Sequence, residues 1–144
     1  MRFCVDEIQG CAMISSANEF AKLRSSQVKE EYDRAAHEEA SLEVWQDVIE
    51  NYPELRKWVA HNKTVPLEIL QELCKFDVEV RFFVASKRKL SQELFRLLSA
   101  DPDSTVRQQI ASNKKTPIDI LEKLSTDKDE HVVRVAKFNL SNRK

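Results

Sequence analysis

The stretch that decides the fold is Val106-Arg107-Gln108-Gln109-Ile110-Ala111, because the chain contains three related copies of it. The earlier copies are Leu55-Arg56-Lys57-Trp58-Val59-Ala60 and Val80-Arg81-Phe82-Phe83-Val84-Ala85, so that Arg56, Arg81 and Arg107 align. Self-similarity at a nearly constant spacing, here on the order of 25 positions, is typical of arrays in which one helical unit stacks on the next. The sequence therefore predicts an all-α fold built from short repeats.

Each unit is predicted to contain two short helices. Apolar residues such as Val80, Val84 and Ala85 fall on one face of the first helix. Asn62 and Asn113 follow that helix, and we expect them to end it in the left-handed conformation that Asn tolerates. The second helix is expected to begin at four aligned residues, since Ser caps a helix and Pro fits its first turn: Ser41, Pro66, Ser91 and Pro117.

The repeat extends beyond its clearest copies. Residues 32–49 form a degenerate first unit, and Val133-Arg134-Val135-Ala136-Lys137-Phe138 resembles the first helix of a last one. Terminal units of such arrays are usually atypical. The predicted organisation is a lead-in segment, 1–27, followed by a repeat domain, 28–144. The lead-in segment should hold one helix after Ser16-Ala17-Asn18-Glu19, which has the capping-box pattern, with Gly10 marking the break before it.

Composition agrees with one folded domain. The chain has 144 residues, of which 42% are hydrophobic and 33% charged, and its single Gly leaves little room for sheet turns. The formal charge of −1 predicts no general attraction to nucleic acid or anionic membranes. Cys4, Cys11 and Cys74 form no CxxC pair and are typical of reduced thiols. With no signal peptide and no apolar run near the ~20 residues of a membrane span, a cytoplasmic location is expected.

One unit carries a family resemblance: Asp103-Ser104-Thr105-Val106-Arg107-Gln108-Gln109-Ile110-Ala111-Ser112-Asn113-Lys114-Lys115-Thr116-Pro117-Ile118-Asp119-Ile120-Leu121-Glu122-Lys123-Leu124. It resembles the leucine-rich repeat variant and the related short HEAT-like repeats of bacteria, over roughly residues 32–140. The resemblance implies a right-handed α-α superhelix of about four to five short units after the lead-in helix. Some family members carry an iron-sulfur module before the repeats. Because only Cys4 and Cys11 lie upstream here, we expect no cluster.

The repeated arginines have two interpretations. They could form a ladder that binds anions, or they could make structural ion pairs with acids four residues earlier on the same helix. The spacing favours the structural interpretation, with the pairs Asp77–Arg81, Asp103–Arg107 and Glu130–Arg134.

Stacking of units would align their loops into two charged edges. The acidic edge, between units, comprises Asp77, Asp101, Asp103, Asp127, Asp129 and Glu130. The basic edge, in the turn inside each unit, comprises Lys63, Lys87, Arg88, Lys89, Lys114 and Lys115. Three interpretations stay open: both edges are merely solvated loops, the two edges form a dipolar surface that steers and orients a charged protein partner, or the basic edge contacts nucleic acid.

Two aromatic residues are further candidates for partner binding. Trp58 and Phe82 align with Gln108 at the variable, non-core place of the motif. Aromatic side chains often carry binding energy at the centre of interfaces. The alternative is that both rings pack against a neighbouring unit.

Metal, cofactor and catalytic motifs are not found in the sequence. His37-Glu38-Glu39 is not the HExxH spacing that places two imidazoles on one helical face, and one Gly excludes a Gly-rich phosphate loop. The sequence therefore predicts a non-enzymatic protein without metal or cofactor, which binds another macromolecule, and it favours a protein as that partner. Small bacterial proteins of similar repeat content resemble immunity proteins, so the partner is expected to be a toxin domain. The alternatives are an adaptor or scaffold and a nucleic-acid-binding protein.

Overall fold

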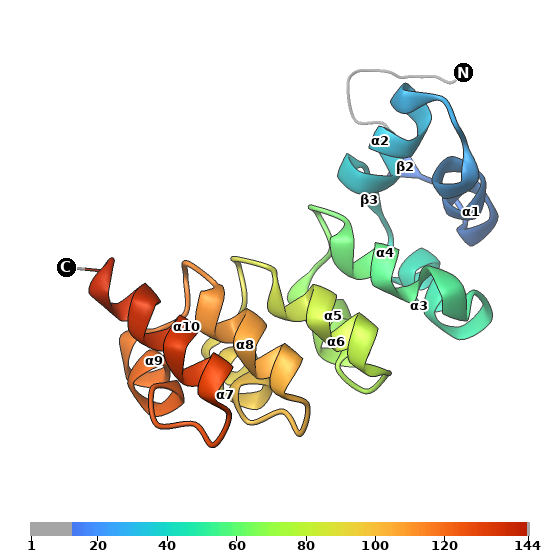
Figure 1. The fold of residues 1–144 in the computed structure, drawn as a ribbon. Helices are drawn as coiled ribbons and strands as arrows, with labels where there is room; N and C mark the ends of the chain where they lie inside the picture. Colours follow the sequence, from blue (N-terminus) through green and yellow to red (C-terminus); the bar gives the residue numbers. More distant parts are fainter. Residues whose placement is uncertain (1–12, 144) are drawn as a thin grey trace. The chain divides into compact units, whose positions relative to one another are not determined.

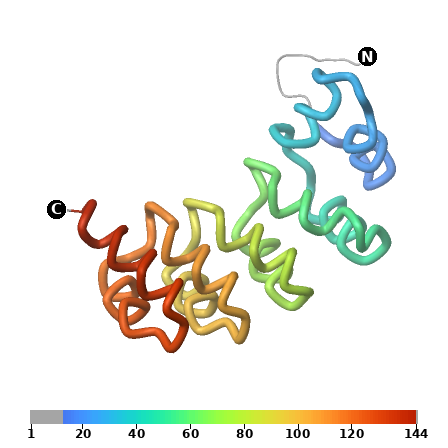
Figure 2. The backbone as a smooth tube through the Cα atoms, in the orientation of Figure 1, coloured from blue at the N-terminus to red at the C-terminus, as the bar shows by residue number. Residues whose placement is uncertain are grey.

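The computed structural model describes residues 13–143, so the expectations for Cys4, Cys11 and Gly10 lie outside the described residues. The chain divides into two compact units, Met1–Leu73 and Cys74–Lys144. The described part is helical apart from one very short pair of strands, which Figure 1 labels, and the helical coils can be followed along the backbone in Figure 2. The all-α prediction is therefore confirmed.

The described part of the first unit runs from the strand β2 (Met13–Ile14) to the helix α5 (Leu67–Leu73). The two residues of β2 pair in parallel with β3 (Glu39–Ala40), a contact that the sequence did not predict. Between them and after them come the helices, which are α1 (Ala17–Ser25), α2 (Lys29–His37), α3 (Leu42–Asn51), the 3-10 turn η1 (Pro53–Leu55) and α4 (Arg56–His61).

The start of α1 confirms Ser16 as the cap, while Glu19 reaches back to Ser15, one residue before the position that a capping box requires. The Ser16 hydroxyl accepts a hydrogen bond from the Glu19 amide at 3.0 Å. The Glu19 carboxylate reaches back and accepts from the Ser15 amide at 2.7 Å. The first bond satisfies an amide that the helix start would otherwise leave free, and the second ties the residue before the cap to the first turn. Together they fix where the lead-in helix begins.

The core of the first unit joins the lead-in helix to the first predicted repeat. Phe20 of α1 and Trp45 of α3 are both completely buried, and their rings meet edge to face at 5.3 Å. Arg34 of α2 adds an ion pair to Glu19 of α1 at 3.4 Å. The first compact unit therefore contains all of the predicted segment 1–27 and the beginning of the predicted repeat domain.

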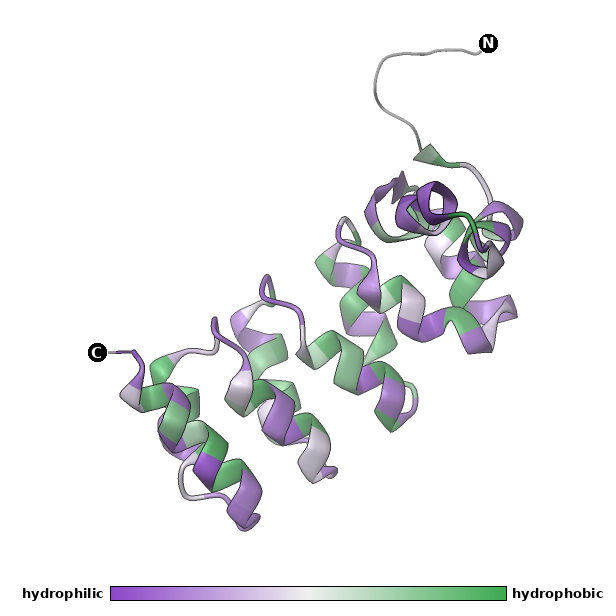
Figure 3. Ribbon diagram, turned by 45° about the horizontal axis from the view of Figure 1, so that its top comes forward, coloured by the Kyte–Doolittle hydropathy of each residue, from purple (hydrophilic) through white to green (hydrophobic). Residues whose placement is uncertain are grey.

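The second unit contains helices in two layers. In Figure 1, α6 (Val78–Ala85), α8 (Ser104–Ser112) and α10 (Glu130–Ser141) lie side by side. The helices α7 (Gln92–Ser99) and α9 (Ile118–Leu124) contact each other in a second layer. Figure 3 shows helices that carry both hydrophobic and hydrophilic colours and turns that are mostly hydrophilic, as expected when each helix buries one face.

Second-helix starts are where the sequence placed them. Ser41 and Ser91 cap α3 and α7, because each hydroxyl accepts from the amide three residues later at 3.2 Å. Pro117 is the residue directly before α9, and Pro66 directly precedes α5. Local residue preferences at helix starts therefore predict this part of the structure well.

The last helix continues the repeat in a different register from the predicted one. Val132 and Ala136 are completely buried, and they follow the buried Val106 and Ile110 at the same interval that separates Arg81 from Arg107. The prediction that Val133 and Arg134 match Val106 and Arg107 is therefore off by one residue. Arg134 lies on the exposed side of α10, and two-thirds of its side chain is accessible.

Candidate binding surface

The arginines at the start of α6 and α8 pair with acids far along the chain. Arg81 Nε lies 2.7 Å from Asp101, and Arg107 Nε lies 2.9 Å from Asp127, each with a second hydrogen bond from Nη2 to the other carboxylate oxygen. The predicted partners, Asp77 and Asp103, are wrong for these two arginines. Each pair instead connects the first helix of a repeat to the loop after its second helix. Residue spacing along a single helix cannot reveal such a long-range pair.

These arginine groups are structural. Hydrogen bonding to Asp101 raises the pKa of Arg81, so the guanidinium is charged at any ordinary pH. Arg107 is 6% exposed, and its Nη1 also donates to the Asp101 carbonyl at 2.7 Å. The predicted pair Glu130–Arg134 is confirmed, at 3.9 Å, but both side chains are largely exposed. Surface pairs of that kind stabilise a fold by less than about 1 kcal/mol.

The acidic edge of the second unit serves the fold at each of its five aspartates. Asp77, Asp103 and Asp129 cap α6, α8 and α10, and each accepts hydrogen bonds from the first turn of its helix. The backbone amide of His131 is the main cause that lowers the pKa of Asp129, and the Thr105 hydroxyl is the main cause for Asp103. Asp101 and Asp127 are the partners of the two arginines. Much of this negative charge is therefore compensated within the unit.

The asparagines after the first helices do not have the predicted conformation. The φ angles of Asn62 and Asn113 are −59° and −68°, outside the left-handed region. Their side chains explain the residue type instead. Asn62 Nδ2 donates to the Ala35 and Glu38 carbonyls at 2.8 and 3.0 Å, across to the end of the preceding first helix. A buried amide that meets free carbonyls satisfies groups that a helix end leaves unpaired.

The same bridge recurs twice in the second unit. Asn113 Nδ2 donates to the Ala85 and Lys87 carbonyls at 3.0 and 2.7 Å. Asn139 Nδ2 donates to the Ala111 and Asn113 carbonyls at 2.8 and 3.0 Å. These bridges hold the C-terminal ends of α6, α8 and α10 next to one another.

The bridges also bring basic turns together. Asn113 connects the turn that carries Lys114 and Lys115 to the turn that begins at Lys87 and continues with Arg88 and Lys89. Among the described residues, no acid forms an ion pair with Arg88, Lys89, Lys114 or Lys115. We call the five basic residues of these two turns the basic ridge: Lys87, Arg88, Lys89, Lys114 and Lys115. Lys63, the remaining predicted member, belongs to the first unit.

The two predicted aromatic residues lie in different units. Trp58 is half-buried, with the Arg24 guanidinium 3.9 Å above its ring and the His61 ring edge-on at 5.6 Å. Phe82 is 37% exposed. Val59 and Val84 are equivalent buried positions of the repeat, so the residue equivalent to Trp58 is Phe83. The alignment of Trp58 with Phe82 is therefore off by one residue.

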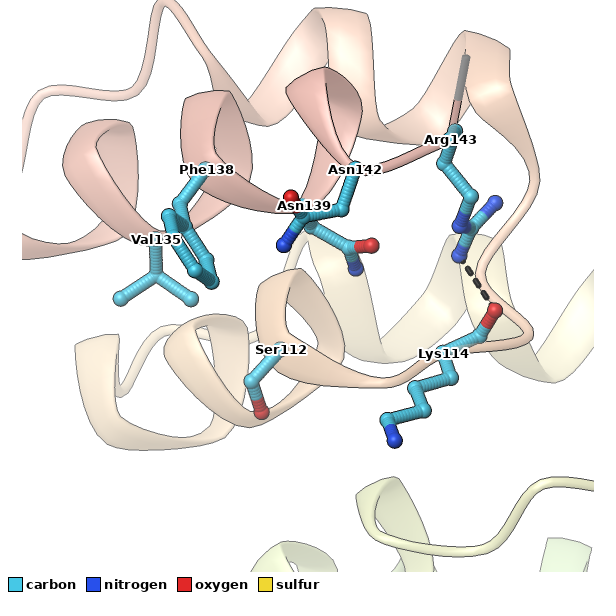
Figure 4. A pocket seen from close by; sticks show the side chains of 7 residues that line it. All are labelled: Ser112, Lys114, Val135, Phe138, Asn139, Asn142 and Arg143. Atoms are coloured by element: carbon cyan, nitrogen blue, oxygen red, sulfur yellow. Dashed lines mark hydrogen bonds between the residues drawn. The ribbon is translucent and has the colours of Figure 1, made fainter.

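A cavity of about 540 Å³ lies between the C-terminal halves of α8 and α10. Figure 4 shows Val135 and Phe138 side by side on α10, and Arg143 beside the Lys114 carbonyl. The complete lining is Ser112, Lys114, Val135, Phe138, Asn139, Asn142 and Arg143. Phe138 is 68% exposed, the largest exposed fraction among large hydrophobic side chains of the described residues.

The sequence contained a signal for this pocket that the motif alignment missed. At the register of the buried residues, Phe138 falls at the position of Ser112 in the preceding unit, and of Ser86 in the unit before that. Because this position carries Ser86 and Ser112 in the two preceding units, and His61 in the unit before them, the fold does not require an aromatic hydrocarbon side chain there. The one-residue error in the last unit concealed this substitution.

The units differ in charge although the chain is almost neutral. Residues 1–73 contain 8 Lys and Arg against 14 Asp and Glu, a formal charge of −6. Residues 74–144 contain 15 against 10, a formal charge of +5. The basic ridge and the pocket therefore lie in a unit whose charge attracts acidic ligands.

The described residues offer little support for a metal site, a reactive thiol or a membrane span. Residues 13–143 contain no cluster of three His, Cys, Asp or Glu side chains that could hold a metal ion. Burial raises the pKa of the Cys74 thiol to about 11, with Asp101 adding to the shift, which disfavours the reactive thiolate. None of the helices in this range is long and apolar enough to span a bilayer.

Comparison with family models, with curated proteins and with solved structures gives no match for the chain.

Proposed function

We propose that this chain is a non-enzymatic helical-repeat protein that binds another protein. Its repeats would form a right-handed α-α superhelix of about four to five short units, of the leucine-rich-repeat-variant or HEAT-like kind. The recurring Asn bridges and Arg–Asp pairs support this proposal, because they connect equivalent positions at nearly constant spacing. Repeat arrays of this kind usually act through extended binding surfaces.

The observation that carries the binding proposal is the pocket between α8 and α10. Phe138 is exposed beside Val135, and the lining also contains two cationic residues, Lys114 and Arg143. An exposed aromatic side chain in a concave site with polar surroundings has the composition of an interface centre. The buried polar groups of the same unit, by contrast, are occupied in holding helix ends together.

Affinity purification from the native cell lysate tests the proposal. The wild-type protein should retain one protein at stoichiometric amount, and the variant Phe138→Ser should lose it. The control variant Leu97→Ser changes another exposed apolar residue, 57% accessible on α7, and should retain it. Circular dichroism checks that both variants fold. Retention by Phe138→Ser as strong as by the wild type would contradict this surface as the binding site.

Nucleic-acid binding is the second candidate, and the basic ridge is the observation that favours it. If this candidate is correct, the captured material is sensitive to nuclease and its retention falls steeply with salt concentration. A nuclease-resistant protein partner argues against it.

A narrower form of the main proposal identifies the partner as a toxin domain, with this chain as its immunity protein. It rests on the sequence resemblance alone. Expression of the neighbouring gene product should then inhibit growth, and co-expression of this chain should restore it. Growth inhibition that persists on co-expression would remove the toxin hypothesis and leave an adaptor or scaffold role.

A further inference from the structure

We infer that the pocket between α8 and α10 binds an acidic peptide segment of the partner that carries one large apolar side chain. The apolar side chain contacts Val135 and Phe138, and the carboxylates that follow it contact Lys114, Arg143 and the basic ridge. The inference rests on the proposed function and names the chemistry of the partner at this site.

The apolar part of the site lies on one face of α10. Val135 and Phe138 are three residues apart, so their side chains are neighbours on the helix surface. Figure 4 shows them next to each other, across from Ser112 of α8. Together they offer enough exposed apolar area for one aliphatic or aromatic side chain, and their burial would supply the hydrophobic part of the affinity.

One of the two cations of the site, Arg143, is held in place by the fold. Arg143 donates to the carbonyls of Thr116 at 2.9 Å, Asn113 at 3.3 Å and Lys114 at 2.5 Å. These bonds use three of the five N–H donors of a guanidinium and leave two for a ligand. Because the side chain is held before binding, a carboxylate that pairs with it loses little of its gain to ordering entropy.

The sign of the charge identifies the ligand as acidic. The pocket lining contains Lys114 and Arg143 and no acidic residue. The basic ridge continues from Lys114 through the turn that Asn113 bridges to Lys87. Asp101 and Asp127 of the same unit do not compete for Lys114 or Arg143, because they pair with Arg81 and Arg107. Charge complementarity of this kind contributes mainly to specificity and association rate.

The lining favours a peptide over a nucleic acid. Its one aromatic ring, Phe138, is accompanied by an aliphatic neighbour, and no second ring in the lining offers a stacking surface for a base. Single-stranded nucleic acid usually binds along a series of stacking rings. An apolar contact beside a few fixed donors is the usual form of a ligand pocket, and it suits one apolar side chain of a peptide with a carboxylate next to it.

Fluorescence anisotropy with a labelled synthetic peptide tests the inference on the full chain. The probe is a short peptide with one Phe followed by a run of Glu. It should bind, and replacing its Phe by Ala or its Glu by Gln should each weaken binding about tenfold, since interface contacts of this size are worth about 1.4 kcal/mol. Raising the salt concentration should weaken the Glu probe and leave the Gln probe nearly unchanged.

Matched protein variants localise the effect. Phe138→Ser and Lys114→Glu should each weaken the Glu probe about tenfold. Lys123→Glu makes the same charge change at an exposed site on α9 outside the pocket and should have a much smaller effect. Circular dichroism confirms folding, which exposed positions such as Phe138 and Lys114 allow.

The outcomes separate this inference from the proposed function. Preferential binding of the Gln probe, or of a probe with Lys in place of Glu, would overturn the acidic chemistry. If that binding still depended on Phe138, the pocket would stand as a protein-binding site. Absence of binding by every probe would overturn the inference while the lysate experiment decides the function separately. Tighter binding of a single-stranded oligonucleotide, or self-association detected by light scattering at low salt, would also overturn it.

Discussion

The two units of the molecule keep nearly the same repeat length by different means. In the first unit, the large rings of Phe20 and Trp45 fill the core, and the formal charge is −6. In the second unit, buried pairs such as Arg107–Asp127 connect helices to loops, and the formal charge is +5. Repeats of nearly the same length therefore each form a pair of helices, but the interactions that stabilise the pair differ along the chain.

The position of Trp45 shows how this variation arises. The residues that occupy this place in successive units are Trp45, Leu70, Phe95 and Leu121, and all are buried. Trp45 is the largest of them, and Phe20 from the lead-in helix packs against its ring. A bulky residue in the first repeat thus fits because a helix outside the repeat pattern shares its core.

The largest effect is expected from Trp45→Ala, which should cost about 4 kcal/mol of unfolding free energy because it empties a fully buried site. Urea denaturation measures the total loss, and hydrogen exchange locates it. Exchange should accelerate most in α1 and α3. Trp45→Phe, which introduces the residue of the equivalent position 95, should lose less than half as much. Equal acceleration of exchange throughout α8 and α10 would contradict the prediction that the loss of Trp45 destabilises mainly the first unit.

The next largest effect is expected from Arg107→Ala, at about 3 kcal/mol, since it leaves the Asp127 carboxylate without its buried partner. The double variant Arg107→Met, Asp127→Leu removes both charges and should recover much of the loss. Arg134→Ala serves as the control and should change stability by less than about 0.5 kcal/mol, because the Arg134 pair is exposed. A similar loss for both single variants would contradict a structural role for the buried pair. All three are measured by urea denaturation.

The Asn bridge is common to both units, so Asn62→Ala and Asn113→Ala should have similar effects. Each should cost about 2 kcal/mol, because two carbonyls lose their amide donor. Gln108→Ala, at an exposed site on α8, is the control and should be nearly neutral. Thermal unfolding compares the three variants. A loss of stability in only one of the two Asn variants would show that the two bridges are not equivalent.

The smallest effect concerns pH and the helix caps of the second unit. The pKa values of Asp103 and Asp129 lie below the ordinary value of 3.8. A lowered carboxyl pKa contributes stability above the unfolded-state pKa, and this contribution is lost as pH falls through the folded-state pKa.

The double variant Asp103→Asn, Asp129→Asn tests this dependence, because Asn also caps helices but does not titrate. Its stability should fall less steeply than that of the wild type between about pH 5 and about pH 2. Urea denaturation across this range measures both proteins. Parallel curves would show that the caps do not contribute to acid sensitivity.

Much of the local structure was predictable. The start of α1 follows from Ser16 and Glu19, and the starts of α3 and α7 follow from Ser41 and Ser91, because each cap joins residues close together in the chain. The partners of Arg81 and Arg107 were not predictable, because the paired acids lie beyond the next helix and the sequence also offered acids at helical spacing.

The candidate site also contains some residues that the sequence predicted and others that it did not. Lys114 and the other residues of the basic ridge were identified from the sequence as a group of turn cations. Phe138, Val135 and Arg143 were missed, because their grouping depends on the register of α10 against α8. That register is fixed by the burial of Val132 and Ala136, not by the resemblance of Val133 and Arg134 to an earlier motif.

The sequence by itself determined the helices, their caps and the repeat length, because these depend on apolar periodicity and on contacts between residues close along the chain. Only the tertiary structure decided which acid neutralises which arginine, what the buried asparagines bridge, and which aspartates of the acidic edge pair within the fold. Those outcomes depend on long-range contacts, where several partners of equal chemistry compete and packing geometry selects one.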